Sequence, residues 1–142
     1  MNGLLLDTNV PSELTRSQPD PRLMQWVRSA AHEDLYVSVI TLGEIRKGFT
    51  MLPAGKRRQQ LERWLAEEME PWFEGRILPV DRRVADRWGI LEGQRRLQGR
   101  PLNMADGLIA ATSLEHDLTL VTRNVRDYDG LGVTLVNPWE AT

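Results

Sequence analysis

The chain has 142 residues, a formal net charge of −2 and no cysteine. Hydrophobic residues make up 41% and charged residues 27%, a globular composition that fits one domain over residues 1–142. Without cysteine there is no disulfide framework, thiolate nucleophile or Cys-ligated metal site. The sequence has no apolar run near the ~20 residues of a membrane helix and no basic leader, so we expect a cytoplasmic protein.

Short apolar runs alternate with longer segments of helical periodicity along the whole chain. The run 35–39 is rich in β-branched and aromatic residues, and a proline in 77–80 indicates an edge strand. Because the strands are apolar throughout, they predict an α/β fold with a mainly parallel sheet covered on both faces. The predicted strands are 3–6, 35–39, 77–80, 118–121 and 133–136, and the predicted helices begin at 11 and span 21–31, 41–49, 56–69, 81–97 and 103–114.

Three acidic residues fall where predicted strands end or the next helices begin. Asp7 follows the first strand, Glu44 lies early in the helix after the second, and Asp106 lies in the first turn of a later helix. Ligands of parallel sheets bind at the carboxyl ends of the strands, so Asp7 and Glu44 belong near each other, and Asp106 joins them if its helix docks there. Each acid also has a local explanation: a turn residue or cap for Asp7, a capping-box glutamate for Glu44, and a helix-dipole acid for Asp106.

The joint placement of these acids favours a metal site. Three carboxylates within about 5 Å repel one another unless a cation neutralises them or one takes a proton. His32 and His116 lack the spacing of metal ligands, and we expect both on the surface or in loops. Oxygen-only ligation by Asp7, Glu44 and Asp106 suits Mg²⁺ or Mn²⁺, not zinc.

A polar segment after the fourth predicted strand adds candidates to this site. Thr122 and Asn124 point toward it if the strand geometry continues for two residues. Asp127 either turns back to contact the metal, directly or through water, or closes the loop. Thr8 and Asn9, which follow the first strand, are candidates for orienting the carboxylates through hydrogen bonds.

Four ordered segments, residues 6–10, 44–48, 106–112 and 121–124, resemble the motifs of PIN-domain proteins. The ending from Gly132-Val133 to Asn137-Pro138-Trp139 resembles the VapC toxins of that family, in their FitB-like branch. The resemblance runs from Leu4 to Trp139, which is nearly the whole chain.

The resemblance implies a three-layer α/β/α sandwich whose acidic cluster binds Mg²⁺ or Mn²⁺ and cuts RNA. By position, Asp7 and Asp106 resemble the principal metal ligands and Glu44 the third acid. Asn124 stands where many members carry an aspartate, and Asp127 is the candidate to supply that charge. The resemblance also implies the toxin of a type II toxin–antitoxin pair, held as a homodimer and silenced by a cognate VapB-like antitoxin.

Cleavage by such a site would use cations held by the three acids to lower the pKa of a bound water and polarise the scissile phosphate. The acidic pocket needs nearby positive charge to attract RNA. Arg46 and Lys47, next to Glu44, and Arg123, after the fourth strand, are the preferred candidates by position. Further candidates are Arg126, Lys56-Arg57-Arg58, Arg82-Arg83 and Arg95-Arg96-Arg100. A solvated helix face is the alternative interpretation of each such pair.

Two other functions remain open from the residues alone. The chain is a non-catalytic partner-binding module if its acids only cap helices. It is an aspartyl-phosphate phosphatase if Asp7 is a nucleophile, although the second acid expected two positions later is absent.

Overall fold

The computed structural model describes residues 3–140. Within them, five short strands form one parallel sheet in the order β3-β2-β1-β4-β5. Strands β2 and β3 are added on one side of β1, and strands β4 and β5 on its other side. The strand order therefore reverses between β1 and β4. The strands are β1 Leu4–Leu6, β2 Leu35–Ser38, β3 Ile77–Leu78, β4 Thr119–Val121 and β5 Leu135–Val136.

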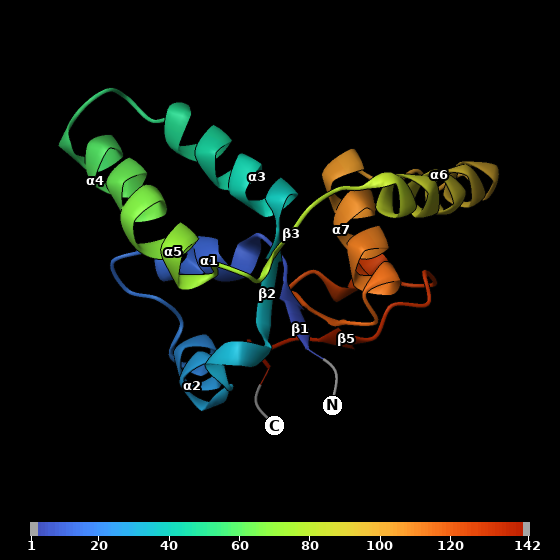
Figure 1. Cartoon of the computed structure of the whole chain (residues 1–142), viewed down its shortest axis with the longest axis horizontal. Coiled ribbons are helices and arrows are strands. Elements are labelled where there is room, and N and C mark those ends of the chain that lie inside the picture. The colour runs from blue at the N-terminus through green and yellow to red at the C-terminus, as the bar shows by residue number, and fades with distance from the viewer. Residues whose placement is uncertain (1–2, 141–142) are drawn as a thin grey trace.

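Helices cover both faces of this sheet (Figure 1): α1 to α5 lie on one side, and α6 and α7 on the other. No helix within residues 3–140 has the length and apolar character that crossing a membrane requires. The α-helices are α1 Asn9–Leu14, α2 Pro21–Ser29, α3 Val39–Thr50, α4 Lys56–Trp64, α5 Glu70–Trp72, α6 Arg82–Leu97 and α7 Met104–Glu115. Shorter helical turns are η1 His32–Asp34, the π-helical turn η2 Leu65–Met69 and η3 Val125–Tyr128.

Two hydrophobic cores share the sheet because successive side chains of a strand point to opposite faces. Leu6 and Val121 pack into the core with α3 and α4, whereas Leu5 and Leu120 pack into the core with α6 and α7. Both faces of each central strand are therefore buried, which explains their unbroken apolar sequences. The predicted three-layer α/β/α fold is confirmed, including the edge position of the strand at 77–78.

Helix α3 starts earlier than the sequence predicts. Ser38, the last residue of β2, caps it by accepting a hydrogen bond from the Ile40 N–H on its Oγ at 3.0 Å. Glu44 therefore lies in the middle of α3 rather than at its third position, and the capping-box interpretation of Glu44 is wrong. Its carboxylate is left for contacts outside its own helix.

Other boundaries differ from the prediction by small amounts. The predicted helix 56–69 is interrupted by the π-helical turn and continues to Trp72, with Pro71 tolerated at the start of α5. Asp81 and Asn103, predicted as helical, instead cap α6 and α7 by accepting hydrogen bonds from the second or third helical N–H groups. The strands predicted at 77–80 and 133–136 are each two residues long.

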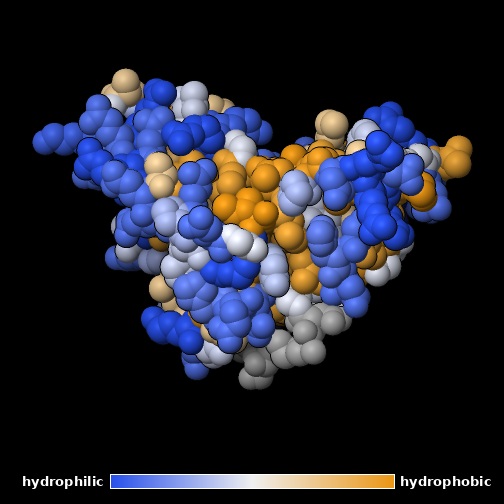
Figure 2. All heavy atoms as spheres, in the orientation of Figure 1, coloured by the Kyte–Doolittle hydropathy of each residue, from blue (hydrophilic) through white to orange (hydrophobic). Residues whose placement is uncertain are grey.

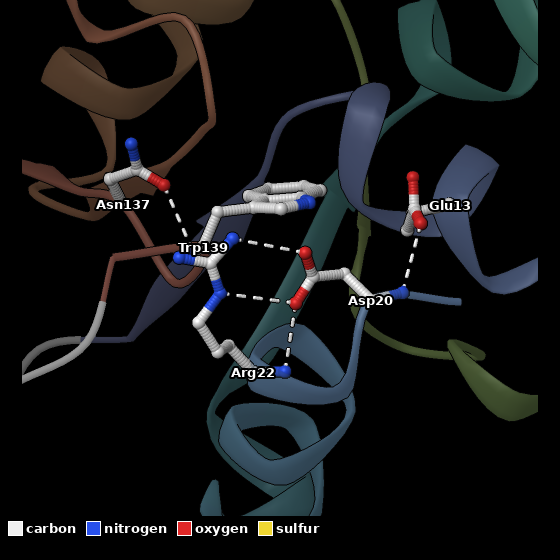
Figure 3. A network of polar contacts seen from close by, with 5 residues as sticks. All are labelled: Glu13, Asp20, Arg22, Asn137 and Trp139. Atoms are coloured by element: carbon white, nitrogen blue, oxygen red, sulfur yellow. Dashed lines mark hydrogen bonds and ion pairs between the residues drawn. The ribbon is translucent and has the colours of Figure 1, made fainter. Parts of the chain in front are cut away.

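The C-terminal segment packs against the α2 side of the sheet. Trp139 is buried in the core, and its backbone N–H donates to Asn137 Oδ1 at 2.9 Å (Figure 3). Beside it, Asp20 caps α2, forms an ion pair with Arg22 at 3.1 Å, and donates its N–H to the buried Glu13 carboxylate at 3.0 Å. Trp139 is thus a core residue.

The other tryptophans divide between core and surface. Trp26, Trp64 and Trp88 are half-buried and pack against the two cores. Trp72 is 39% exposed and stacks on the His32 ring with 3.7 Å between ring centroids.

Gly107 is a position where packing requires the absence of a side chain. A Cβ there would lie 2.7 Å from Trp88 Cδ1, which is closer than two non-bonded carbon atoms approach each other. We expect Gly107→Ala to lower the free energy of unfolding by about 1–3 kcal/mol in urea denaturation. Gly89→Ala is the matched control, because Gly89 lies inside α6 with open space around it, and it should raise stability by about 0.5–1 kcal/mol. Equal effects of the two substitutions would contradict this packing.

Candidate active site

The predicted acids lie at the carboxyl edge of the sheet, where the strand order reverses. Asp7 directly follows β1, and its N–H donates to the Val121 carbonyl of β4 at 2.9 Å. Thr122 directly follows β4 and donates its N–H to the Val136 carbonyl at 2.9 Å. Helix α3 follows directly from the end of β2 (Figure 1). The molecular surface is hollowed between the part that contains α3 and α4 and the part that contains α6 (Figure 2). This is the place where parallel α/β sheets bind ligands.

Asp7 is a buried carboxylate, 4% exposed, surrounded by hydrogen-bond donors. Its Oδ1 accepts from the Thr8 N–H at 2.8 Å, and its Oδ2 accepts from Thr122 Oγ1 at 2.8 Å and from Tyr128 Oη at 3.0 Å. Burial raises the pKa of Asp7, and the Thr122, Thr8 and Tyr128 hydrogen bonds oppose that rise. Because Thr8 rather than Asp7 is the N-cap residue of α1, the capping explanation does not account for Asp7.

Asp106 lies in the first turn of α7, as predicted, and faces Asp7 across a tyrosine hydroxyl. Tyr128 Oη lies 3.2 Å from Asp106 Oδ1 and 3.0 Å from Asp7 Oδ2. Burial and then the Asp7 charge raise the pKa of Asp106 to about 6. A phenol carries one proton and donates to one carboxylate at a time, so a second proton or a cation is needed to satisfy both acids.

Glu44 joins the cluster through a threonine. Its Oε1 accepts from Thr8 Oγ1 at 2.7 Å, and Thr8 Oγ1 also lies 3.2 Å from Thr41 Oγ1. The Glu44 charge contributes to the raised pKa of Asp7 and of Asp106. Asp7 and Asp106 therefore share one tyrosine hydroxyl, and Glu44 is linked to Asp7 through Thr8.

The other predicted polar residues divide between the cluster and its rim. Asn9 donates to Thr122 Oγ1 at 3.2 Å, and the backbone N–H of Asn124 donates to the same oxygen at 3.0 Å. Asp127 is exposed, and its charge contributes to the raised pKa of Asp106. His32 and His116 are both exposed, as predicted.

The predicted RNA-binding cations lie on the surface of the protein. Arg46 and Lys47 are exposed on α3, and Arg46 Nη1 lies 3.5 Å from Glu62 Oε2. Arg123 is exposed, with its guanidinium 5.5 Å from the centre of the Trp139 ring.

The chain is similar to proteins of known family. The PIN domain model matches residues 4–129. The chain belongs to the PIN domain family. This PIN domain is 40% identical over 136 residues to Toxin FitB of Neisseria gonorrhoeae, which covers 96% of the chain and 98% of the relative. It is 38% identical over 137 residues to VapC ribonuclease Y4jK of Sinorhizobium fredii, again covering 96% and 98%.

The fold of this PIN domain also matches that of a solved relative. A structure of FitAB bound to an IR36 DNA fragment superposes with a TM-score of 0.91 at 38% identity and covers 98% of this chain and 97% of that one. The predicted resemblance to PIN-domain proteins of the VapC and FitB group is confirmed.

Tyr128 is the residue of this site that sequence reasoning missed. It lies in η3, is 1% exposed, and presents its hydroxyl between Asp7 and Asp106. Its buried ring belongs to the core beside α7. The sequence feature that could have identified it is a tyrosine six positions after Thr122, because the hydroxyl of a buried tyrosine usually has a hydrogen-bond partner.

The donor set of this PIN domain fits a hard divalent cation. Within residues 3–140, no three acidic or histidine side chains are gathered closely enough to ligate one ion together. Mg²⁺ is commonly held by only one or two carboxylates while it keeps several waters. Asp7 and Asp106, which face one hydroxyl, supply such a pair of carboxylates, and Glu44 is held aside by Thr8.

The raised pKa of Asp106 predicts how stability depends on pH without metal. The folded protein keeps a proton on Asp106 up to about pH 6, whereas the unfolded chain releases it near 3.8. The contribution of Asp106 to stability is therefore lost as pH rises from about 4 to 6 and stays constant above that. After allowance for solvent exposure, we expect a loss of about 1–2 kcal/mol.

Urea unfolding with chelator at pH 4.5 and 7 measures this loss. Asp106→Asn should lose less stability than the unmodified protein between these two pH values. Identical pH dependence in both proteins would contradict the assigned shift.

Proposed function

We propose that this chain is the toxin of a toxin–antitoxin pair and a metal-dependent endoribonuclease that hydrolyses RNA phosphodiester bonds. The observation that carries the proposal is the pair formed by the buried Asp7 and the half-buried Asp106, joined by one hydroxyl beside Glu44 at the carboxyl edge of a PIN-domain sheet. The names of its relatives, VapC ribonuclease and Toxin FitB, support the same activity.

Asp7 and Asp106 are the proposed metal ligands, with Glu44 as the third acid and Asp127 as a contact at the rim. A divalent cation such as Mg²⁺ or Mn²⁺, when bound there, would lower the pKa of a water and place positive charge beside the scissile phosphate. Thr122 orients Asp7, and Thr8 orients both Asp7 and Glu44, through the hydrogen bonds described above.

The partners follow from the same relatives. We propose a cognate VapB-like antitoxin as the inhibitor, a homodimer as the working unit, and RNA as the substrate, because FitB is named a toxin and the solved FitAB complex matches over nearly the whole chain. Since the substrate is RNA, we place the activity in the cytoplasm.

A non-catalytic partner-binding module is the alternative. The contacts of Asp7 and Glu44 weigh against it, because neither acid caps a helix and both are held by threonines at a shared edge. Isolated capping residues have no reason to converge in this way.

Cleavage of total cellular RNA by the purified protein tests the proposal. We expect cleavage with Mg²⁺ or Mn²⁺, none with EDTA, and products that carry 5′-phosphate and 3′-hydroxyl ends. Asp7→Asn serves as the matched inactive variant, with its fold checked by circular dichroism. Cleavage that persists in EDTA, or Asp7→Asn cleaving at the unmodified rate, would overturn the proposal.

A further inference from the structure

A cavity of about 340 Å³ opens beside Asp106, and none of its lining residues belongs to α3. Three arginines, Arg95, Arg100 and Arg126, line it together with Asp106 and Asp127. These arginines come from α6, from the loop before α7, and from η3. An acidic group of the proposed active site and three cations therefore share one hollow.

Arg95 is a structural residue of this cavity, because its buried side chain holds the loops that form the cavity wall. It is 7% exposed, its Nε donates to the Arg100 carbonyl at 2.8 Å, and its Nη1 donates to the Asp129 carbonyl at 3.1 Å. One buried guanidinium thus fixes two loops, the first with Arg100 and the second with Arg126 three residues before Asp129. The positive φ of Gly99, +72°, turns the first loop back so that the Arg100 N–H donates to the Arg95 carbonyl at 2.8 Å.

Arg100 and Arg126 keep their charges available. Both are exposed, and neither forms an ion pair with any side chain in residues 3–140. By contrast, Arg46 on α3 faces Glu62, and Arg87 on α6 lies 2.6 Å from Glu115. Two unpaired guanidiniums on fixed loops suit a ligand that accepts forked hydrogen bonds, such as a phosphate.

We propose that Arg100 and Arg126 form a phosphodiester-binding subsite that holds the RNA backbone next to the phosphate being cleaved. This inference rests on the proposed ribonuclease function and names the residues that position its substrate. Because the arginines line the same cavity as Asp106 and Asp127, they lie where an RNA backbone needs positive charge to approach these two acids. An acidic antitoxin segment is the other ligand with suitable groups, but nothing requires that segment to enter at Asp106.

The double variant Arg100→Gln/Arg126→Gln tests the subsite. Its control, Arg28→Gln/Arg63→Gln, removes the same charge from exposed arginines on α2 and α4. Binding of a fluorescein-labelled single-stranded RNA is followed by fluorescence anisotropy in EDTA, so that no strand is cut, at several salt concentrations. Thermal melting of both variants should match the unmodified protein, since all four side chains are exposed.

We expect the cavity variant to bind RNA about 10-fold more weakly, with a log–log salt slope smaller by about 1.4 because two phosphate contacts are lost. With Mn²⁺, its KM for RNA should rise while kcat stays near the unmodified value. The control should bind within 2-fold of the unmodified protein.

The subsite is overturned if the cavity variant binds RNA with unchanged affinity and salt slope, or if the control loses as much RNA affinity. It is also overturned if the cavity variant loses affinity only for the antitoxin. If the unmodified protein cuts RNA and the arginines have no effect, the subsite alone fails. If the arginines govern RNA binding and no metal supports cleavage, the proposed function fails instead.

Discussion

Asp106→Asn is expected to reduce metal-dependent RNA cleavage by roughly 10³-fold or more. Loss of a group that only orients a metal ligand lowers metal affinity or activity by about 10- to 100-fold, and this substitution removes a carboxylate that we propose as a ligand itself. The same change should raise the free energy of unfolding of the metal-free protein at pH 7 by about 1 kcal/mol, because it removes a charge that repels Asp7 and Glu44. Activity and stability should therefore change in opposite directions.

Cleavage assays with Mn²⁺ and urea denaturation with chelator check both parts. Asp86→Asn removes the same charge from an exposed position on α6 and should alter neither quantity. An Asp106→Asn protein that loses both activity and stability would indicate a structural role for this carboxylate, contrary to the proposal.

Tyr128→Phe should destabilise the metal-free protein by about 1–2 kcal/mol at pH 7. The ring keeps its place in the core, while Asp7 and Asp106 lose the hydroxyl that they share. Saturating Mn²⁺ should shrink this difference, because a cation takes over the role of holding the two carboxylates. Thermal denaturation with and without Mn²⁺ measures both effects.

Tyr36→Phe is the control for the loss of a hydroxyl. Tyr36 is half-buried in β2, and its hydroxyl makes no hydrogen bond within the described part of the chain. This variant should be as stable as the unmodified protein. A Tyr128→Phe protein with unchanged stability, or one whose deficit persists fully in Mn²⁺, would contradict the bridging role.

The order of strands and helices was predictable because the chain alternates short apolar runs with amphipathic segments. Leu4–Leu6 and Thr119–Val121 read as buried strands since both of their faces pack against helices. Their lengths were less predictable: Val39 suits a strand by its side chain, but the Ser38 cap starts a helix there. Boundaries of this kind depend on one local hydrogen bond.

The approach of α3 to Asp7 was predictable from topology, whereas the approach of Asp106 and the hydrogen bonds that hold the acids were not. Parallel strands place Asp7 and the start of α3 at one edge regardless of detail. Tyr128 contacts Asp7 across 121 residues of sequence, and only the path of η3 determines that contact. In the same way, Arg95 gives no sign in the sequence that it is buried and fixes two loops.

Binding of Mn²⁺ to the metal-free protein, followed by electron paramagnetic resonance at pH 7, tests the central claim that these acids form a cation site. We predict saturable binding to the unmodified chain that is lost in Asp7→Asn/Asp106→Asn and retained in Asp86→Asn. If the double variant binds Mn²⁺ as the unmodified protein does, or the unmodified protein binds none, the acids at this edge are not a metal centre.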